Sequence, residues 1–222
     1  MVNLKMKEIN FNLLKEKLPD YPELIDKDEY FNAAVLIPFV KIKNNYHLLF
    51  EKRAANIRQG GEVSFPGGEF DKETDKSLEE TAIRETMEEL RLEKEKINVI
   101  GRLGILMVPG VVVNAFIAEV EIENISSVDF DKTEVEKIFT VPASFFKETS
   151  ADTYHINLEA HPFYIDEEGK KIDLLPVEQL KLPPRYSKPW GRFKRKVYVY
   201  NYDGEVIWGI TAALVKRVAE LI

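Results

Sequence analysis

The sequence predicts an α/β (α+β) fold, and three observations lead to that prediction. Strand-like segments recur between residues 32 and 146, and again between residues 196 and 208. A helical pattern at 75–92 interrupts the β-rich region, and an amphipathic helical pattern closes the chain at 211–222. With 222 residues, 45% of them hydrophobic, the chain fits a single domain, 1–222, that carries extensions.

The first elements lie before residue 53. An N-terminal helical extension is expected over about 1–30, and it contains a short amphipathic helix. One side of that helix carries Ile9, Leu13, Leu14 and Leu18. Strands follow at 32–42 and 46–52, and the turn-forming residues between them predict a hairpin-like pair.

The middle of the chain places one helix between two groups of strands. A glycine-rich segment at 60–68 precedes the helical pattern at 75–92. Strands are then predicted at 99–107 and 111–121, on either side of the Pro109-Gly110 turn.

The last third of the chain contains an expected insertion. Residues 134–146 predict a strand that runs into a short helix. Residues 154–190 are polar and proline-bearing, and we interpret them as an insertion of loops with an extra hairpin. Strands at 196–202 and 205–208 flank Asp203-Gly204, which is a hairpin turn signal, and Trp208 is expected in the core.

Composition excludes several classes of function. The formal charge of −7 argues against non-specific nucleic-acid binding by a basic surface. The absence of cysteine removes disulfides, thiol nucleophiles and cysteine metal sites, and it fits a reducing compartment such as the cytoplasm. No apolar run reaches the about 20 residues of a membrane span, so we expect a soluble protein without a membrane partner.

The helix at 75–92 carries a concentrated acidic face. At about 100° per residue, Glu85, Glu88 and Glu89 share one face, whereas Met87 and Leu90 lie on the other. Such like charges repel by roughly 0.2–0.5 kcal/mol per pair unless something neutralises them. Mg²⁺ or Mn²⁺ would do so, because both prefer carboxylate oxygens. The alternative is a solvated helix face without a ligand.

A rigid glycine turn precedes this helix. Residues Phe65-Pro66-Gly67-Gly68 end an apolar strand, and the two glycines allow a backbone group to approach a ligand closely. The alternative interpretation of the two glycines is a simple tight turn.

Together the loop and the acidic helix resemble the signature of the Nudix hydrolase superfamily. The signature is carried by Gly68 and by the run Arg84-Glu85-Thr86-Met87-Glu88-Glu89-Leu90-Arg91-Leu92. The resemblance implies a Nudix fold, in which a mixed β-sheet is sandwiched between helices. It also implies that Glu85, Glu88, Glu89 and the Gly68 carbonyl bind Mg²⁺ or Mn²⁺, and that Arg84 orients the carboxylates.

The signature departs from the family pattern in its loop and at its end. The loop from Gly68 to Arg84 is longer than usual by about two residues, and no glutamate occupies the expected position in it. Asp71, Glu73 and Asp75 are the candidates to take the place of that glutamate. Arg91 replaces the usual glycine, so the helix either turns differently or continues toward residue 96, and Thr86 is polar where the family is apolar.

Residues outside the signature resemble the coenzyme A diphosphatases (CoA pyrophosphatases) within the superfamily. The similar segments are 61–68 and 207–213. The resemblance implies hydrolysis of the diphosphate of coenzyme A or acyl-coenzyme A to 3′,5′-ADP and 4′-phosphopantetheine or its acyl form. Glu85 is the first candidate for the base and Glu134 the second. Arg53 and Arg58 are assigned to the substrate's phosphates, with surface ion pairing as the alternative.

Other functions and partners remain open at this stage. ADP-ribose, a dinucleotide or another nucleoside diphosphate derivative is the first alternative substrate, and a catalytically inactive binding or regulatory module is the second. A basic cluster at 185–196, with Tyr186, Trp190 and Phe193 among six cations, either binds a nucleotide or forms a solvated strand edge or a subunit contact. The sequence is also compatible with a homodimer.

Overall fold

The computed structural model describes residues 10–20 and 24–222, and its elements follow one another largely as the sequence predicts. The helices are α1 (Phe11–Lys17), α2 (Leu78–Leu90), α3 (Ala143–Glu148) and α4 (Gly209–Ala219). The strands of the main sheet are β1 (Phe31–Ile42), β2 (Asn45–Arg53), β3 (Val63–Ser64), β4 (Gly67–Glu69), β5 (Ile97–Val108), β6 (Val111–Val120) and β7 (Val135–Pro142). The remaining strands are β8 (Asp152–Ala160), β9 (Phe163–Ile165), β10 (Lys171–Asp173), β11 (Trp190–Tyr202) and β12 (Glu205–Trp208).

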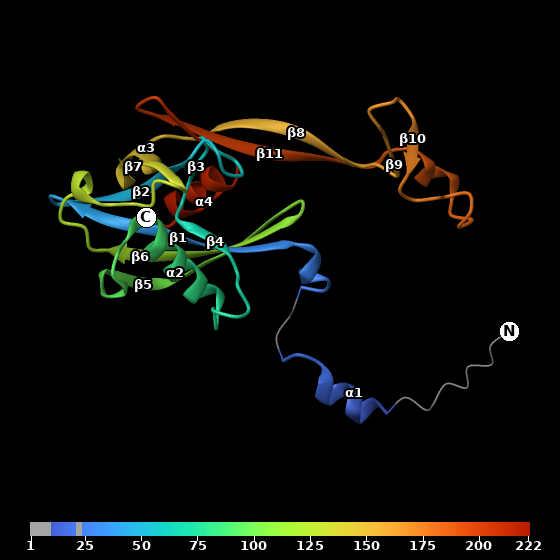
Figure 1. Cartoon of the computed structure of the whole chain (residues 1–222), viewed down its shortest axis with the longest axis horizontal. Helices are drawn as coiled ribbons and strands as arrows, with labels where there is room; N and C mark the ends of the chain where they lie inside the picture. Colours follow the sequence, from blue (N-terminus) through green and yellow to red (C-terminus); the bar gives the residue numbers. More distant parts are fainter. Residues whose placement is uncertain (1–9, 21–23) are drawn as a thin grey trace.

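The main sheet is mixed, and β1 lies at its centre (Figure 1). β1 pairs in parallel with β6 and antiparallel with β2 and β4, and the outer strands β5 and β7 pair with β6 and β2. The predicted hairpin turns are confirmed, because Val108 pairs with Val111 across Pro109-Gly110 and Tyr202 pairs with Glu205 across Asp203-Gly204.

The two faces of the sheet are covered by different helices. Alternate residues of β1 point to opposite sides: Leu36 belongs to a core cluster with Ala82 and Leu90 of α2. Ile37 belongs to a second cluster with Leu214 and Val215 of α4. This arrangement confirms the predicted mixed sheet between helices.

The helix with the acidic face, α2, begins and ends at identifiable caps. It begins at Leu78 rather than near residue 75, because the Ser77 hydroxyl accepts a hydrogen bond from the Glu80 amide. It ends at Leu90, because Arg91 takes a left-handed conformation (φ 47°) and the Leu92 amide donates to the Met87 carbonyl at 3.2 Å. The helix therefore does not continue toward residue 96, and Arg91 adopts the conformation that glycine favours.

Thr86 has a simple structural role. Its side chain is fully buried, and its hydroxyl donates to the Ala82 carbonyl at 2.7 Å. The hydroxyl is thereby satisfied within the helix, so a polar residue is accepted on the buried side of α2.

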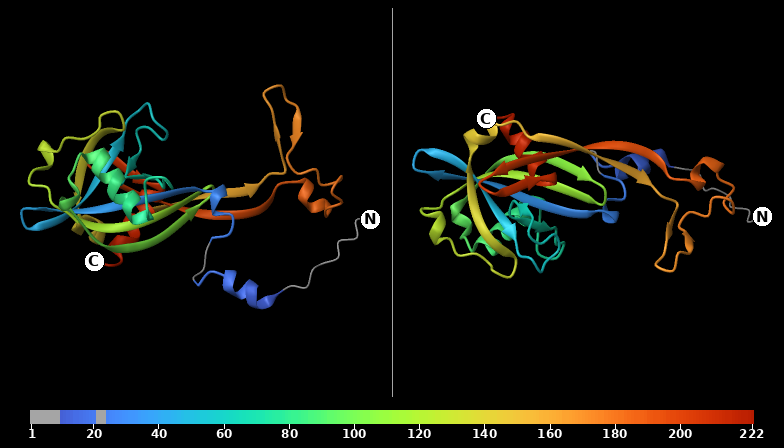
Figure 2. Two further views of the ribbon diagram at one scale, coloured as in Figure 1. Left: turned by 60° about the horizontal axis from the view of Figure 1, so that its bottom comes forward. Right: turned by 90° about the horizontal axis from the view of Figure 1, so that it is seen from above.

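β8 and β11 form a long antiparallel ribbon that runs away from the main sheet (Figures 1 and 2). We call β8, β11 and residues 161–189 between them the arm. The predicted extra hairpin is present there as β9 and β10. However, 154–160 is a strand rather than a loop, and β11 begins at Trp190 rather than at 196. The two strands pair with each other, from Asp152 with Val199 to Ala160 with Trp190, and the polar composition conceals this pairing.

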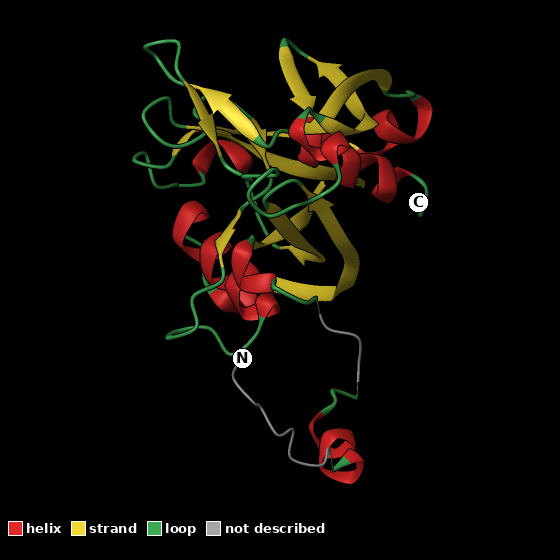
Figure 3. Ribbon diagram, turned by 90° about the vertical axis from the view of Figure 1, so that its right-hand side faces the viewer, coloured by secondary structure: helices red, strands yellow, loops and turns green. Residues whose placement is uncertain are grey.

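The predicted N-terminal helix is present as α1, and it lies apart from the sheet (Figure 3). Its residues are all exposed, Leu13 and Leu14 included, and Ile9 lies outside the described residues. Within residues 10–20 and 24–222, no helix is long and apolar enough to cross a membrane.

Candidate active site

The site forms where β1 and β2 separate. The two strands pair only at one end, from Phe39 with Leu48 to Ile42 with Asn45. Beyond that point β3 pairs with β2 and β4 pairs with β1. We call this intervening segment, residues 63–69, the seam. The Leu36 amide also donates to the Pro66 carbonyl at 2.9 Å, so the seam is bonded to strands on both sides.

The two glycines of the seam bring α2 close to the sheet. A Cβ atom at Gly68 would lie 2.4 Å from the Glu85 carboxyl carbon, and one at Gly67 would lie 2.3 Å from the Ala34 carbonyl oxygen. The Gly67 amide donates to Glu89 Oε2 at 2.9 Å. Any side chain at these two positions would therefore push the seam away from Glu85 or from β1.

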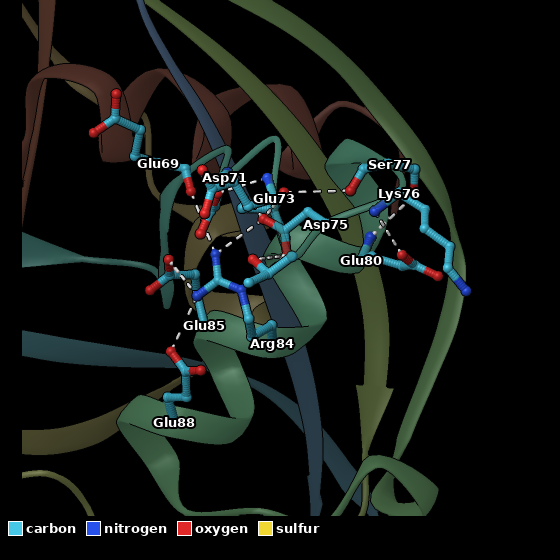
Figure 4. A network of polar contacts seen from close by, with 12 residues as sticks. Glu69, Asp71, Glu73, Asp75, Lys76, Ser77, Glu80, Arg84, Glu85 and Glu88 are labelled. Atoms are coloured by element: carbon cyan, nitrogen blue, oxygen red, sulfur yellow. Dashed lines mark hydrogen bonds and ion pairs between the residues drawn. The ribbon is translucent and has the colours of Figure 1, made fainter.

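Arg84 holds the acidic face of α2 in place (Figure 4). Its Nη1 lies 2.9 Å from Glu85 Oε1 and 3.0 Å from Glu88 Oε2. Its Nε and Nη2 lie 2.8 and 3.0 Å from the two oxygens of Asp75. The predicted role of Arg84 thus has a geometric basis, since one guanidinium contacts three carboxylates.

Asp75 is the loop acid that faces Arg84. Its carboxylate is buried and also accepts from the Thr81 hydroxyl at 2.9 Å and from the Asp71 amide at 3.1 Å. The Arg84 guanidinium holds the pKa of Asp75 well below its usual range. Asp71 and Glu73 are exposed, so of the three acids left open by the sequence only Asp75 is built into the site.

The three glutamates of α2 differ in exposure. The Glu88 side chain is 60% exposed, the Glu85 side chain is 16% exposed, and Glu89 is buried. Burial raises the pKa of Glu85 and of Glu89, and neighbouring carboxylates raise both further. The repulsion between these neighbouring carboxylates is relieved either by protonation of one of them or by a bound cation.

Sequence reasoning missed Glu51, a fourth carboxylate of the site. It lies on β2, is fully buried, and accepts a hydrogen bond from the Ser64 hydroxyl at 2.8 Å. Burial raises its pKa, and the charges of Glu134 and Glu85 raise it further. One signal was available in the sequence: Glu51 directly continues the apolar run Leu48-Leu49-Phe50, which is typical of a strand buried on both faces.

A cavity of about 430 Å³ opens beside the seam. Arg53, Arg58, Gly67 and Gly68 line it from the main sheet, and the arm adds Arg195 and Lys196. Of the six cations in the basic cluster at 185–196, only Arg195 and Lys196 line this cavity. Arg53 Nε donates to the Arg58 carbonyl, and the Arg58 guanidinium lies 5.4 Å from the centre of the Phe31 ring.

Two further sequence expectations concern this region. The prediction that Trp208 lies in the core is wrong: it is 44% exposed and lines the cavity, because Ile207 takes the inward position on β12. Glu134 is exposed, and its backbone carbonyl accepts from the Ala54 amide. Its charge nonetheless raises the pKa of Glu51 and of Glu85, so Glu134 lies within electrostatic range of both groups.

The donor set fits a hard divalent cation. The close approach of Glu85 to Gly68 and the buried oxygens of Glu51 and Glu89 are the kind of oxygen ligands that Mg²⁺ and Mn²⁺ prefer. In the described ranges, no three His, Asp or Glu side chains are gathered into a ready-made metal site. Instead Arg84 Nη1 contacts oxygens of Glu85 and Glu88, so a cation would share these oxygens with Arg84 or displace it.

The chain resembles known proteins along most of its length. The sequence profile of the NUDIX domain matches residues 31–156. An uncharacterised Nudix hydrolase NudL of Photorhabdus laumondii is 30% identical over 210 residues, which cover 94% of each chain. A NudL of Yersinia enterocolitica is 31% identical over 196 residues, which cover 85% of this chain and 80% of the relative. A Nudix hydrolase of M. smegmatis, RenU, matches in structure with a TM-score of 0.44 and 20% identity, over 53% of this chain and 73% of that one.

Proposed function

Because the chain belongs to the NUDIX domain family, we propose that it is a metal-dependent diphosphatase of coenzyme A or acyl-coenzyme A. The family makes it a hydrolase of nucleoside diphosphate derivatives. The proposal adds the substrate and the products, which are 3′,5′-ADP and 4′-phosphopantetheine or its acyl form.

One observation carries the substrate choice. The cavity beside the seam combines four cations, Arg53, Arg58, Arg195 and Lys196, with the exposed ring of Trp208. Guanidinium and ammonium groups suit phosphates, and an indole ring suits stacking on an adenine. Coenzyme A presents both groups, because it carries a 3′-phosphate and a diphosphate on the same adenosine.

Nudix hydrolases use divalent cations such as Mg²⁺ or Mn²⁺, and Glu85, Glu88, Glu89 and the Gly68 carbonyl are the proposed ligands. When bound, such an ion neutralises phosphoryl charge and lowers the pKa of the attacking water. The seam fixes the position of these groups, since Gly67 holds Glu89 and Gly68 allows Glu85 to approach.

The chain's own residues supply the remaining chemistry. A water oxygen bonds to one phosphorus while the bond from that phosphorus to the bridging oxygen breaks, and the bridging oxygen leaves with the other phosphate. Glu85 takes the proton of the water in this proposal, with Glu134 as the second candidate base. Arg84 acts as a positioning residue, because its guanidinium contacts Glu85, Glu88 and Asp75 at once.

The test is a substrate panel with matched variants. We expect kcat/KM for coenzyme A to exceed that for ADP-ribose and for dinucleotides, in the presence of Mg²⁺ or Mn²⁺. Glu85→Gln and Glu89→Gln should each lower kcat by about a hundredfold or more, whereas the exposed Glu79→Gln should not change it. Faster hydrolysis of ADP-ribose would contradict the substrate choice, and binding without any turnover would favour the inactive module.

Two expectations about the protein's setting belong to the same proposal. We propose a cytoplasmic location, which the lack of cysteine favours. We also propose a homodimer, and light scattering of the purified full chain measures its mass directly.

A further inference from the structure

One carboxylate oxygen of the site has no partner. Glu51 is fully buried, and its Oε1 accepts from the Ser64 hydroxyl at 2.8 Å. Its Oε2 has no hydrogen-bond partner among the described residues. The nearest paired cation, Arg53 Nη1, lies 4.0 Å away from the other oxygen, Oε1. A buried carboxylate oxygen without a donor costs free energy that the fold alone has no reason to bear.

The seam is bonded to both Glu51 and Glu89. Ser64 holds one oxygen of Glu51, and three residues further on the Gly67 amide holds one oxygen of Glu89. The seam is short and bonded on both sides, so the two carboxylates are fixed relative to each other. Gly68, the residue after Gly67, lies against the Glu85 carboxylate, so Glu51, Glu89 and Glu85 all contact the seam within five residues, 64–68.

We propose that Glu51 is a further ligand of the divalent cation, which it contacts through Oε2 together with Glu85 and Glu89. This inference rests on the proposed function, because it concerns the same metal site. It adds a ligand from β2 to a set that otherwise comes from α2 and the seam. A cation in that position gives the unpartnered oxygen its contact and neutralises the repulsion among the carboxylates.

A purely structural role makes a different forecast. If Glu51 served only to accept from Ser64, a glutamine in its place would do the same through its amide oxygen. Glu51→Gln would then leave metal binding unchanged. The variant keeps the size of the side chain and the Ser64 contact, and it removes the charge alone.

The experiment is a titration of the metal-free full chain with Mn²⁺. Calorimetry measures the heat of binding, and the electron paramagnetic resonance signal of free Mn²⁺ measures how much of the ion stays unbound. We expect Glu51→Gln to weaken Mn²⁺ binding by about tenfold or more. Glu79→Gln is the matched control, since it removes one negative charge from the exposed side of α2 and should bind as the wild type does. Equal affinity in Glu51→Gln and the wild type would overturn the assignment but leave the proposed site intact.

Two further readouts make the result decisive. Without metal, Glu51→Gln should melt at a higher temperature than the wild type, because a buried charge beside Glu89 is gone, and Mn²⁺ should raise its melting temperature less. If glutamine prevents folding, Glu51→Asp keeps the charge but withdraws the carboxylate by one methylene, and unchanged affinity there also overturns the assignment. A wild-type chain that binds no Mn²⁺ would overturn the proposed metal site itself.

Discussion

Asp75 connects the loop before α2 to the acidic face of the helix. Both of its oxygens accept from Arg84, and Arg84 in turn contacts Glu85 and Glu88. A paired carboxylate and guanidinium, mostly withdrawn from water, are costly to separate, because the partner left behind keeps its charge without compensation. Asp75 therefore stabilises the fold and orients the catalytic candidates at the same time.

Replacing Asp75 by asparagine should reduce the free energy of unfolding by about 2–3 kcal/mol at pH 7. The pKa of Asp75 is lowered from its ordinary 3.8, so its contribution is complete above that pH and is lost as the pH falls further. Urea unfolding at pH 7, 5 and 3 measures the gap between the wild type and Asp75→Asn, which should shrink only at the lowest pH.

The control for this experiment is Asp129→Asn. Asp129 pairs with Arg91 at 2.7 Å, but both side chains are exposed, so the stability should hardly change. A gap for Asp75→Asn that is equally small at pH 7 would show that its contact with Arg84 does not stabilise the fold.

The seam and α2 act as a unit at the scale of elements. Gly68 is in an extended strand, so its backbone accepts alanine, but the new Cβ would meet the Glu85 carboxylate at 2.4 Å. Gly68→Ala should therefore lower kcat/KM for coenzyme A by about a hundredfold or more through displacement of Glu85, with the fold retained. Steady-state kinetics and circular dichroism measure the two effects separately.

Glu69→Ala is the neighbouring control, because its side chain is exposed on the same strand. It should keep both activity and secondary structure. If Gly68→Ala were as active as Glu69→Ala, the close approach of Glu85 to the seam would have no part in catalysis.

The elements were largely predictable from the sequence, and the exceptions have physical reasons. Hydrophobic periodicity and turn residues identified α2, α4 and the longer strands of the main sheet, β1, β2, β5, β6 and β7. The predicted turn at Gly67-Gly68 is instead part of strand β4, because both residues pair with β1. The choice of Asp75 over Asp71 and Glu73 required the position of Arg84 in space. Glu51 was missed because its neighbours Lys52 and Arg53 give the end of β2 the composition of an exposed strand.

At the scale of the whole molecule, the arm is the main feature that the sequence pattern did not predict, because residues 154–190 have the composition of loops. Its strands pair over residues far apart in the chain, and polar side chains line them. Neither core cluster contains any of residues 161–189, so the far part of the arm adds nothing to the packing of the main sheet. We therefore propose that the chain is a single domain, 1–222, and that the predicted insertion, 154–190, is an addition to it.

Replacing residues 161–189 by Asn-Gly should leave the domain folded. Ala160 and Trp190 are already paired, and Asn-Gly favours the two-residue turn that joins such a pair. We expect the melting temperature to change by only a few degrees and kcat/KM to persist, because Arg195 and Lys196 remain beside the cavity. An insoluble or unfolded product would show that the far part of the arm is needed for folding.

The seam also explains where this chain is free to vary in length. It is bonded to β1 on one side and β2 on the other, so one inserted residue would misalign either Ser64 with Glu51 or Gly67 with Glu89. The segments on each side of it, 54–62 and 70–77, are bonded to one of these strands only, through Glu62 to Arg53 of β2 and through Phe70 to Asn32 of β1. We therefore expect an inserted residue to be tolerated better in those flanks than within the seam, provided that Asp75 stays beside Arg84.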